Sequence, residues 1–405
     1  MKPGADGNSV KPGADGNLRL HCWVPNLFEF QGGIQRYLQD LLRAIASQPH
    51  RQTTVFNKRD HTGDGDLDTL PNLDFRYFGA MPDALKTPVF AAGLAAAAWR
   101  DRPDLILCGH LHFAPVARAL HRLTGIPYWI FVYGIDAWNV QNPLQQAALH
   151  AADKIIAIGH YTRDRLLAEQ PLDPHKILLL PCMIDAQRFR PAPKPDYLLK
   201  RYGLQPDQPV VLTVARLVGG DSPSDPFGKR HKGYDAVLEA LPQVRQAMPQ
   251  VHYVLVGKGG DRPRLEARIA ELGLQDGVTL AGFVPDAELC DHYNLCDVFA
   301  MPSRGEGFGI VYLEAIACGK PALGGNQDGA TDALAQGELG ALVDPTDIDA
   351  IAQSLIQLLQ GTYPNPLLYQ PAELRQRAIA LYGRDAFTQT LNQLLQESDR
   401  PLSQF

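Results

Sequence analysis

The sequence has no hydrophobic run long enough to cross a bilayer. Residues 126–135, among its most apolar stretches, are about half of the roughly 20 residues that a membrane-spanning helix needs. No signal peptide opens the chain. We therefore expect a cytoplasmic protein whose contact with a membrane, if it has one, is peripheral and at the inner face.

Paired cysteines are also missing. The six cysteines form no C-x-x-C pair, and most of them stand in apolar stretches, where a thiol acts as a small hydrophobe. A reducing cytosol fits this pattern. Nor does charge of one sign dominate, because the formal net charge is −6 with 20% charged residues. The composition thus gives no reason to expect nucleic acid as a partner.

Signals for a metal or a redox cofactor are weak. Asp64-Gly65-Asp66 resembles a metal-binding D-x-D pair, but its polar surroundings are explained by turn composition. His110-Leu111-His112 alternates along an expected strand end without Cys or His partners nearby in the sequence. The glycines of residues 256–260 lack the G-x-G-x-x-G spacing of a nicotinamide site. We expect no metal and no cofactor.

The chain is long enough for two domains, with 405 residues of which 45% are hydrophobic. Short apolar runs alternate with helix-like segments, the pattern of parallel sheets with crossover helices, and the alternation restarts after a proline-rich stretch at residues 191–195. KPGADGN occurs twice near the start, in a segment too polar to offset its ordering entropy. The predicted organisation is a flexible tail (1–17), a first Rossmann-like domain (18–190), a hinge (191–206), a second Rossmann-like domain (207–383) and a C-terminal helix (384–405) that packs back on the first domain.

The strongest chemical signal lies at residues 301–325, where a strand, a glycine-rich turn and a helix follow one another. Glu306 precedes the expected helix and Glu314 lies within it, so the two carboxylates are at most roughly 12 Å apart along the helix axis. The helix begins near Gly309, and a helix N-terminus favours phosphate. One ligand with a sugar, a diphosphate and a ribose could touch both carboxylates.

These residues resemble the retaining GT-B glycosyltransferases of family GT4, whose E-x7-E signature matches Glu306 and Glu314. The resemblance covers nearly the whole chain from Gly32 onward. It implies a GT-B fold, α/β, with two Rossmann-like domains whose parallel sheets face an interdomain cleft. It also implies a metal-independent hexosyltransferase that moves a sugar from a UDP or GDP sugar to a glycan, a lipid-linked or a small-molecule acceptor, as in polysaccharide or glycolipid biosynthesis.

The resemblance assigns roles to residues. Glu306 would hold the donor sugar, Glu314 the ribose hydroxyls, and Arg216 and Lys232 the diphosphate, whose growing charge an arginine fork and a lysine can neutralise in place of a metal. A buried phenylalanine at a strand end would explain Phe283 equally well. The implied catalytic residues are Glu306, Arg216 and Lys232, and the implied donor-binding residues are Gly33, Arg216, Lys232, Phe283, Val284, Glu306, Gly307, Phe308, Gly309, Ile310, Val311 and Glu314.

The sequence departs from the family pattern in three places. Tyr133-Gly134-Ile135-Asp136 stands where many relatives have His-Gly-x-Asp, so Tyr133 takes the place of a histidine. With His110, Tyr133 and Asp136 are expected to contact the acceptor or the sugar. Residues 181–185 replace the more usual Pro-Asn-Gly-x-Asp, and the segment between Arg216 and Lys232 is longer than usual and carries Lys229, Arg230 and His231. Two alternatives stay open, a nucleotide-sugar 2-epimerase-like isomerase and a catalytically weak nucleotide-sugar-binding protein.

Overall fold

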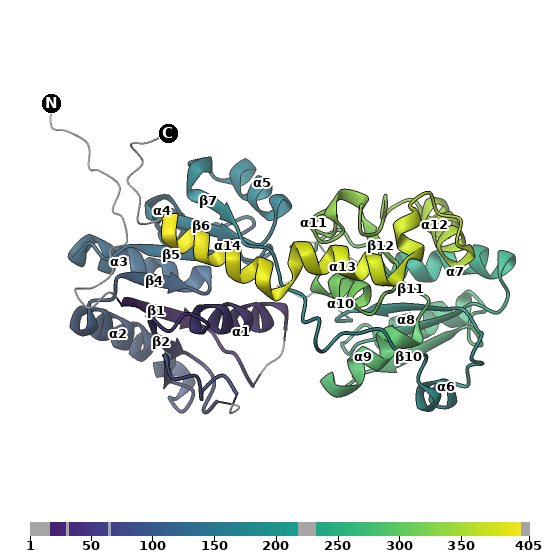
Figure 1. The fold of residues 1–405 in the computed structure, drawn as a ribbon, viewed down its shortest axis with the longest axis horizontal. Coiled ribbons are helices and arrows are strands. Elements are labelled where there is room, and N and C mark those ends of the chain that lie inside the picture. Colours follow the sequence, from purple (N-terminus) through teal and green to yellow (C-terminus); the bar gives the residue numbers. More distant parts are fainter. Residues whose placement is uncertain (1–16, 30–31, 64–65, 218–231, 398–405) are drawn as a thin grey trace. The chain divides into compact units, whose positions relative to one another are not determined.

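The computed structural model describes residues 17–29, 32–63, 66–217 and 232–397. The predicted tail lies outside this part of the chain except for Asn17, and so do Asp64 and the inserted Lys229, Arg230 and His231. The described residues form two compact units (Figure 1). Unit 1 consists of the residues up to Met183 together with those from Asp385 onward, and unit 2 is Ile184–Arg384.

Unit 1 is built, in its described residues, on a seven-stranded sheet in which every neighbouring pair is parallel. The strand order is β3-β2-β1-β4-β5-β6-β7, so the order reverses between β1 and β4. The strands are β1 (Leu18–Val24), β2 (Arg51–Asn57), β3 (Leu73–Tyr77), β4 (Leu105–Cys108), β5 (Tyr128–Val132), β6 (Lys154–Ala157) and β7 (Ile177–Leu179).

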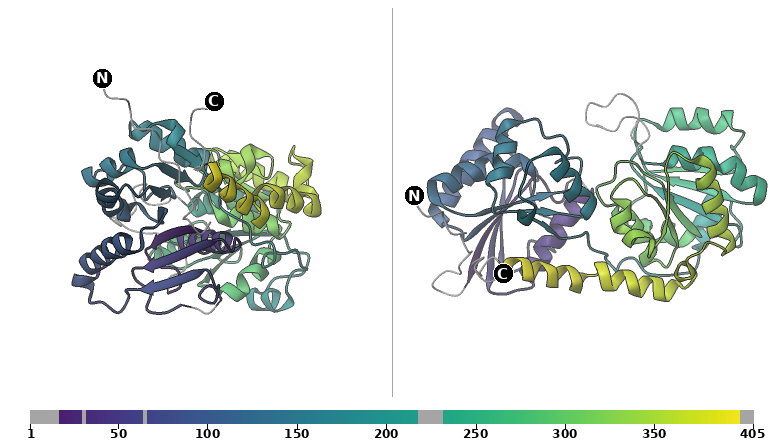
Figure 2. Two further views of the ribbon diagram at one scale, coloured as in Figure 1. Left: turned by 60° about the vertical axis from the view of Figure 1, so that its left-hand side comes forward. Right: turned by 90° about the horizontal axis from the view of Figure 1, so that it is seen from above.

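Except between β2 and β3, whose described connecting residues contain no helix, helices or 3-10 turns connect successive strands (Figure 2). They are α1 (Gly33–Ala46), α2 (Asp83–Asp101), α3 (Ala114–Thr124), α4 (Pro143–Ala151) and α5 (His160–Glu169), with the 3-10 turns η1 (Leu111–Phe113) and η2 (Pro174–Lys176). The last helix of the described residues, α14 (Arg384–Glu397), packs on unit 1. Phe387 meets the ring of Tyr37 edge-on at 5.7 Å, and Asn392 Oδ1 accepts a 2.7 Å hydrogen bond from Arg51.

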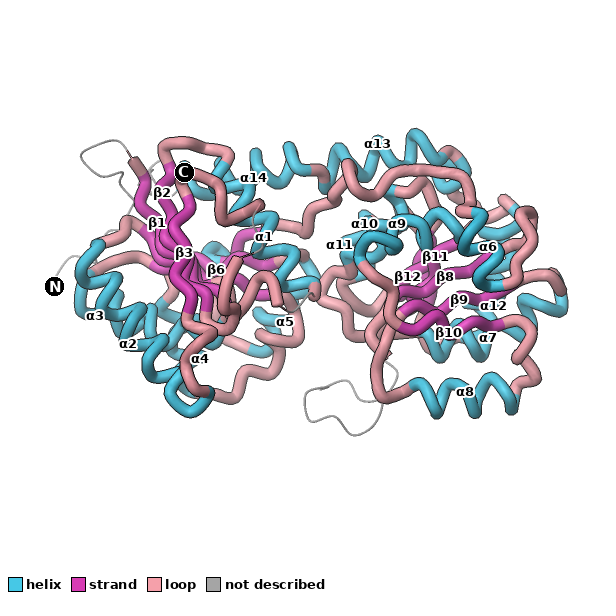
Figure 3. Tube along the Cα trace, turned by 90° about the horizontal axis from the view of Figure 1, so that it is seen from below, coloured by secondary structure: helices cyan, strands magenta, loops and turns pink. Residues whose placement is uncertain are grey.

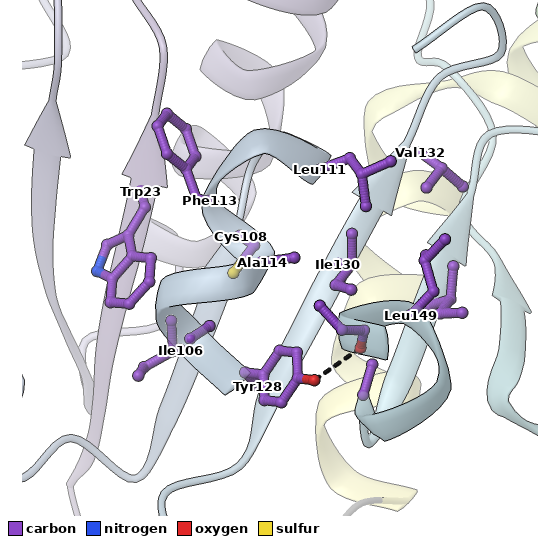
Figure 4. Packing of buried hydrophobic residues seen from close by; sticks show 14 of the residues in the cluster. Trp23, Ile106, Cys108, Leu111, Phe113, Ala114, Tyr128, Ile130, Val132 and Leu149 are labelled. Atoms are coloured by element: carbon purple, nitrogen blue, oxygen red, sulfur yellow. Dashed lines mark hydrogen bonds between the residues drawn. The ribbon is translucent and has the colours of Figure 1, made fainter. Parts of the chain in front are cut away.

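The core of unit 1 lies where α2, α3 and α4 cover one face of the sheet (Figure 4). Trp23, Ile106 and Tyr128 from three strands are fully buried there. The Tyr128 hydroxyl donates a 2.7 Å hydrogen bond to the Ala148 carbonyl of α4, so its polar end is satisfied inside the core. Burial of each such large apolar side chain stabilises the fold by about 1.5–3 kcal/mol.

Unit 2 repeats the design, in its described residues, with a six-stranded parallel sheet of order β10-β9-β8-β11-β12-β13. Helices cover both faces, α7 and α12 together on one and α9, α10 and α13 on the other (Figure 3). The segment predicted as a hinge contains α6, which contacts α9.

The strands are β8 (Val210–Val214), β9 (His252–Val256), β10 (Val278–Gly282), β11 (Val298–Met301), β12 (Ala322–Gly325) and β13 (Ala341–Val343). The helices are α6 (Asp196–Tyr202), α7 (Tyr234–Ala247), α8 (Arg262–Glu271), α9 (Asp286–Leu295), α10 (Ile310–Ala317), α11 (Ala330–Ala333), α12 (Ile348–Gln360) and α13 (Pro371–Tyr382), with 3-10 turns η3 (Ala335–Gly337) and η4 (Pro366–Tyr369).

Two parallel-sheet α/β domains were predicted from the alternation of apolar runs and amphipathic segments, and this prediction is confirmed. Each sheet reverses its strand order once, which is the arrangement that places ligands at the carboxyl ends of the strands beside the reversal. Within the part of the chain that the structure describes, no helix is both long and apolar enough to pass through a bilayer.

Candidate active site

The predicted donor residues of unit 2 follow the carboxyl ends of its strands. The strand order reverses between β8 and β11. Arg216 comes two residues after β8, and Glu306 comes five residues after β11, so the two lie on either side of the reversal. In open α/β sheets this position forms the ligand crevice. The sheet topology therefore brings these two predicted residues to the same region of unit 2.

The loop that carries Glu306 is fixed by close backbone contacts at three glycines of neighbouring segments. A Cβ at Gly233 would lie 2.2 Å from the Pro302 carbonyl oxygen, and one at Gly325 would lie 2.2 Å from that of Ser303. A Cβ at Gly329 would lie 2.2 Å from the Gly307 oxygen. Any side chain at these positions would push the loop away, because real Cβ atoms do not approach so closely. Glycine at all three lets the backbones touch.

Lys232 and Glu306 form an ion pair in this loop region, with Lys232 Nζ in contact with Glu306 Oε1. The two side chains are only 21% and 15% exposed, so water screens the pair less than it screens a surface pair. Lys232 comes directly before Gly233, whose contact with Pro302 brings the lysine to the loop. The structure thus joins two of the three residues predicted as catalytic.

Helix α10 begins at Ile310, four residues after Glu306. Its N-cap is Gly309, whose φ of +90° and close approach to the Tyr312 ring both favour glycine. The first backbone amides of the helix, which include those of Ile310 and Val311, have no partner within the helix and carry its positive dipole end. Phe308 is different, because its side chain is buried and meets the Tyr382 ring at 5.7 Å. The side chain of Phe308 is therefore not available to a ligand.

Glu314 lies in α10 and is buried, with 6% of its surface exposed. Its Oε2 accepts a 2.7 Å hydrogen bond from the hydroxyl of Tyr293 in α9. Burial and the neighbouring carboxylate raise the pKa of Tyr293 well above its usual value, so the phenol remains a donor. Sequence reasoning missed Tyr293, because a tyrosine in an amphipathic helix carries no local sign of its partner.

Arg216 lies in a segment that continues to pair with its neighbour after the end of β8. Ala215 N donates to the Val256 oxygen at 3.0 Å and Leu217 N donates to the Lys258 oxygen at 3.1 Å. Cβ atoms at Gly257 and Gly259 would lie 1.8 and 1.9 Å from the oxygens of Ala215 and Leu217. Glycine at these two positions after β9 therefore allows the two backbones to approach closely. This approach places the exposed Arg216 side chain beside the strand ends.

Phe283 follows β10 and is 65% exposed. The interpretation of a buried phenylalanine at this strand end is therefore wrong. Lys258 Nζ lies over the Phe283 ring, 4.6 Å from its centroid, at a distance typical of a cation–π contact. Val284 continues the loop and is partly exposed. An exposed aromatic face beside a cation offers a flat surface on which a planar ring can stack.

The predicted residues of unit 1 surround the corresponding reversal between β1 and β4. Gly33 is the first residue of α1, and a Cβ there would meet no atom within 4 Å, so the helix start is open. His110 precedes η1 rather than alternating along a strand. Its ring stacks on that of His112 at 4.3 Å, and its Nδ1 accepts a 3.2 Å hydrogen bond from His112 N. Burial lowers the pKa of His110 to about 4, so it is neutral at pH 7.

Tyr133 and Asp136 follow β5. The Tyr133 side chain is buried, and its hydroxyl donates to the Gly109 oxygen at 3.1 Å. Asp136 Oδ1 accepts a 2.9 Å hydrogen bond from Tyr133 N, while the buried Oδ2 atom has no hydrogen-bond partner. Burial raises the pKa of Asp136 to about 7. The structure therefore places next to Tyr133 a carboxyl group that titrates near neutrality.

No metal site stands out in the described part of the chain, where His, Cys, Asp and Glu form no group of three or more that could hold an ion. Asp66 is exposed in a turn, and the neighbouring Asp68 accepts hydrogen bonds of 2.8 Å from the Tyr77 hydroxyl. Among the cationic side chains near the predicted donor residues are Lys232, which contacts Glu306, and Lys258, which lies over Phe283.

Solved structures show which class this architecture belongs to. Sucrose-phosphate synthase of Thermosynechococcus elongatus matches with a TM-score of 0.74 at 22% identity, over 94% of this chain and 99% of that chain. At this identity the match concerns the fold alone. The chain has the GT-B glycosyltransferase fold.

Sequence comparisons identify the family. The Glycosyltransferase Family 4 model matches residues 31–188, and the Glycosyl transferases group 1 model matches residues 198–379. A GDP-mannose-dependent alpha-(1-6)-phosphatidylinositol monomannoside mannosyltransferase of Mycobacterium tuberculosis is 35% identical over 350 residues, 81% of this chain and 86% of the relative. The enzyme of the same name from Mycolicibacterium smegmatis is 37% identical over 219 residues, 51% of this chain and 53% of the relative. The chain belongs to the GT4 family and is a glycosyltransferase, and these matches give no support to the epimerase alternative.

Proposed function

We propose that the protein is a retaining, metal-independent mannosyltransferase that takes GDP-mannose as donor and a lipid-linked sugar as acceptor. The observation that carries the proposal is the Lys232–Glu306 pair at the β8/β11 reversal, in which Glu306 belongs to the loop that leads into the N-terminus of α10. A cation, a carboxylate and a row of backbone amides are the groups that a sugar diphosphate needs. The choice of GDP-mannose and of a glycolipid acceptor follows the names of the two mycobacterial relatives.

The proposed chemistry needs only side chains of the protein and the donor itself. As the glycosidic bond breaks, charge accumulates on the leaving diphosphate, and Lys232 and Arg216 neutralise it. Glu306 accepts hydrogen bonds from the sugar hydroxyls beside the same lysine. We favour a front-side displacement through an oxocarbenium-like ion pair, in which the leaving phosphate takes the proton of the acceptor hydroxyl. The acceptor oxygen then joins the face that the phosphate leaves, so the anomeric configuration is retained.

The nucleoside part of the donor has its own proposed contacts. Glu314 accepts hydrogen bonds from the ribose hydroxyls, and its bond from Tyr293 fixes the orientation of the carboxylate. The exposed Phe283 ring stacks on the base, and the segment from Phe283 to Val284 meets the base edge through its backbone. In unit 1, the open start of α1 at Gly33 leaves room for a phosphate beside its amides.

The acceptor is proposed to meet unit 1 at His110, Tyr133 and Asp136. The Oδ2 atom of Asp136, which has no partner in the described structure, is the acceptor atom that we expect a sugar hydroxyl to satisfy. The Tyr133 hydroxyl already donates to Gly109, so its contact with a sugar is through the ring edge. A lipid-linked acceptor brings the enzyme to the cytoplasmic face of a membrane as a peripheral protein.

A thermal-shift panel of nucleotide sugars tests the donor. GDP-mannose at 100 times its dissociation constant should stabilise the fold by about 2.7 kcal/mol, whereas UDP-glucose and ADP-glucose at the same concentration should do little. The one-bond C1–H1 coupling in the NMR spectrum of the product then tests retention, because this coupling differs between α- and β-mannosides and retention requires that the product have the anomeric configuration of the donor. A product of inverted configuration would contradict the mechanism. Donor turnover no faster than in buffer, at saturating phosphatidylinositol monomannoside, would favour the nucleotide-sugar-binding protein instead.

A further inference from the structure

We propose that Asp328 is a positioning residue of the active site, whose buried carboxylate fixes the backbone from which Glu306 projects. The inference rests on the proposed role of Glu306 at the donor sugar, and Asp328 itself touches no substrate. Asp328 follows β12 and none of its surface is exposed. A fully buried aspartate is rare unless it has several partners.

The partners of Asp328 surround Glu306. Oδ2 accepts a 2.8 Å hydrogen bond from Glu306 N and a 2.7 Å bond from the Ser303 hydroxyl, while Oδ1 accepts a 2.9 Å bond from Ala330 N. The next residue, Gly329, donates from its N to the Glu306 oxygen at 2.9 Å. Both backbone polar groups of Glu306 are therefore held by residues 328–329. The side chain of Glu306 is left to meet Lys232.

Only a carboxylate satisfies this set of donors. At least three hydrogens converge on its two oxygens, and an ionised carboxylate has acceptors alone. An asparagine carries an NH2 group, which is a donor, in place of one carboxylate oxygen. Whether this group faced the Ala330 N–H or instead the Glu306 N–H and the Ser303 hydroxyl, at least one hydrogen bond would be lost and two donors would face each other. Bonds to an ionised acceptor are about twice as strong as neutral ones, so the exchange is costly at a buried site.

The charged neighbours of Asp328 indicate how its function depends on pH. Lys232 and Glu306 are on the loop side, and the Tyr312 hydroxyl lies 3.3 Å from the Ser303 hydroxyl on the α10 side. Burial raises the pKa of Asp328 to about 6, while the bonds from Ser303, Ala330 N and Gly305 N and the charge of Lys232 oppose the rise. Below about pH 6 a proton occupies one acceptor position, and the bonds to the loop are weakened.

The first test compares Asp328→Asn with Asp297→Asn. Asp297 precedes the amino end of β11, whereas Asp328 follows the carboxyl end of β12, and Asp297 also accepts a backbone bond, from Val210 N at 2.8 Å. In Asp328→Asn, kcat for GDP release from GDP-mannose with phosphatidylinositol monomannoside should fall about 10- to 100-fold, the cost of misplacing a reacting group by about an ångström. The Kd of the donor should change much less. Asp297→Asn should keep its kcat within about twofold.

Three further measurements decide between the proposal and its alternatives. Amide hydrogen exchange should show faster exchange at Glu306 and Gly329 in Asp328→Asn only, a result that needs no substrate. If Asp328→Asn does not fold, Ser303→Ala removes one bond to the same oxygen and should move the acidic limb of the kcat–pH profile upward. The inference would be overturned by an acidic limb that does not move in Ser303→Ala, by unchanged amide exchange in Asp328→Asn, or by a wild-type kcat in folded Asp328→Asn. Wild-type kcat in Glu306→Gln would instead overturn the role of Glu306 on which it rests.

Discussion

Two glutamates eight positions apart lie in different surroundings, and we expect them to contribute differently to catalysis. Glu306 contacts Lys232 in a loop, whereas Glu314 is buried in α10 against Tyr293. Glu306→Gln should therefore lower kcat by at least about 100-fold with little change in donor Kd, because a group at the reacting sugar acts mainly in the transition state. Glu314→Gln should mainly weaken donor binding. Titration of GDP-mannose in steady-state assays separates the two effects, and a Glu306→Gln kcat within twofold of wild type would show that the assigned role is wrong.

The raised pKa of Asp136 makes the free energy of unfolding depend on pH. Its pKa is about 7 in the folded protein and about 3.8 in an unfolded chain. Between these values the folded state binds more protons, so the contribution of Asp136 to the free energy of unfolding is fully present below about pH 4 and is lost as the pH rises to about 7. Asp136→Asn should remove this dependence. Urea unfolding at pH 4.5, 6 and 7.5 should show Asp136→Asn gaining stability relative to wild type with each step, and a constant difference would contradict the shifted pKa.

At the scale of elements, the glycines around the Glu306 loop lead to a steric prediction. Gly329 has an ordinary helical φ of −65°, so alanine fits its backbone conformation, but its Cβ would lie 2.2 Å from the Gly307 oxygen. Gly329→Ala should cost about 1–3 kcal/mol of stability, as overpacking does, and should lower kcat because the loop moves. Gly260→Ala is the matched control, since a Cβ there meets no atom within 4 Å. Chemical denaturation and kinetics of both variants check the prediction, and equal stability of the two would refute it.

The elements themselves were predictable, because apolar runs of strand length and the amphipathic segments between them follow directly from local pattern. The glycine-rich turn and the helix after β11 were predictable for the same reason. The role of Asp328 was not predictable, since an aspartate beside a glycine has the sequence pattern of a turn. Only the fold, in which Asp328 follows β12, brings this residue into contact with the Glu306 loop. The exposure of Phe283 was not predictable from the sequence either, because the burial of a residue at a strand end depends on which helix covers that strand end. The roles given to the site residues stay predictions.

At the scale of the whole molecule, the proposed mechanism requires no divalent metal. Fixed cations in a water-poor site stabilise the leaving diphosphate, so transfer should persist in excess EDTA. Arg216→Ala or Lys232→Ala should lower kcat by on the order of 10²–10³, the usual effect of removing one fixed donor to a developing charge. Added Mg²⁺ should restore neither variant. Loss of activity in EDTA with recovery on adding Mg²⁺ or Mn²⁺ would contradict the proposal and direct attention to Asp64 and Asp66.

The placement of α14 in unit 1 has a consequence for biosynthesis. The strands of unit 1 precede unit 2 in the chain, yet Phe387 and Asn392 reach Tyr37 and Arg51 only after all of unit 2 has been translated. At about 5–20 residues per second, the roughly 200 residues between Met183 and Asp385 take about 10–40 s. During that interval the buried guanidinium of Arg51 lacks the Asn392 oxygen. A nascent unit 1 therefore emerges as an incomplete folding unit, whose helix α14 arrives only after the synthesis of unit 2.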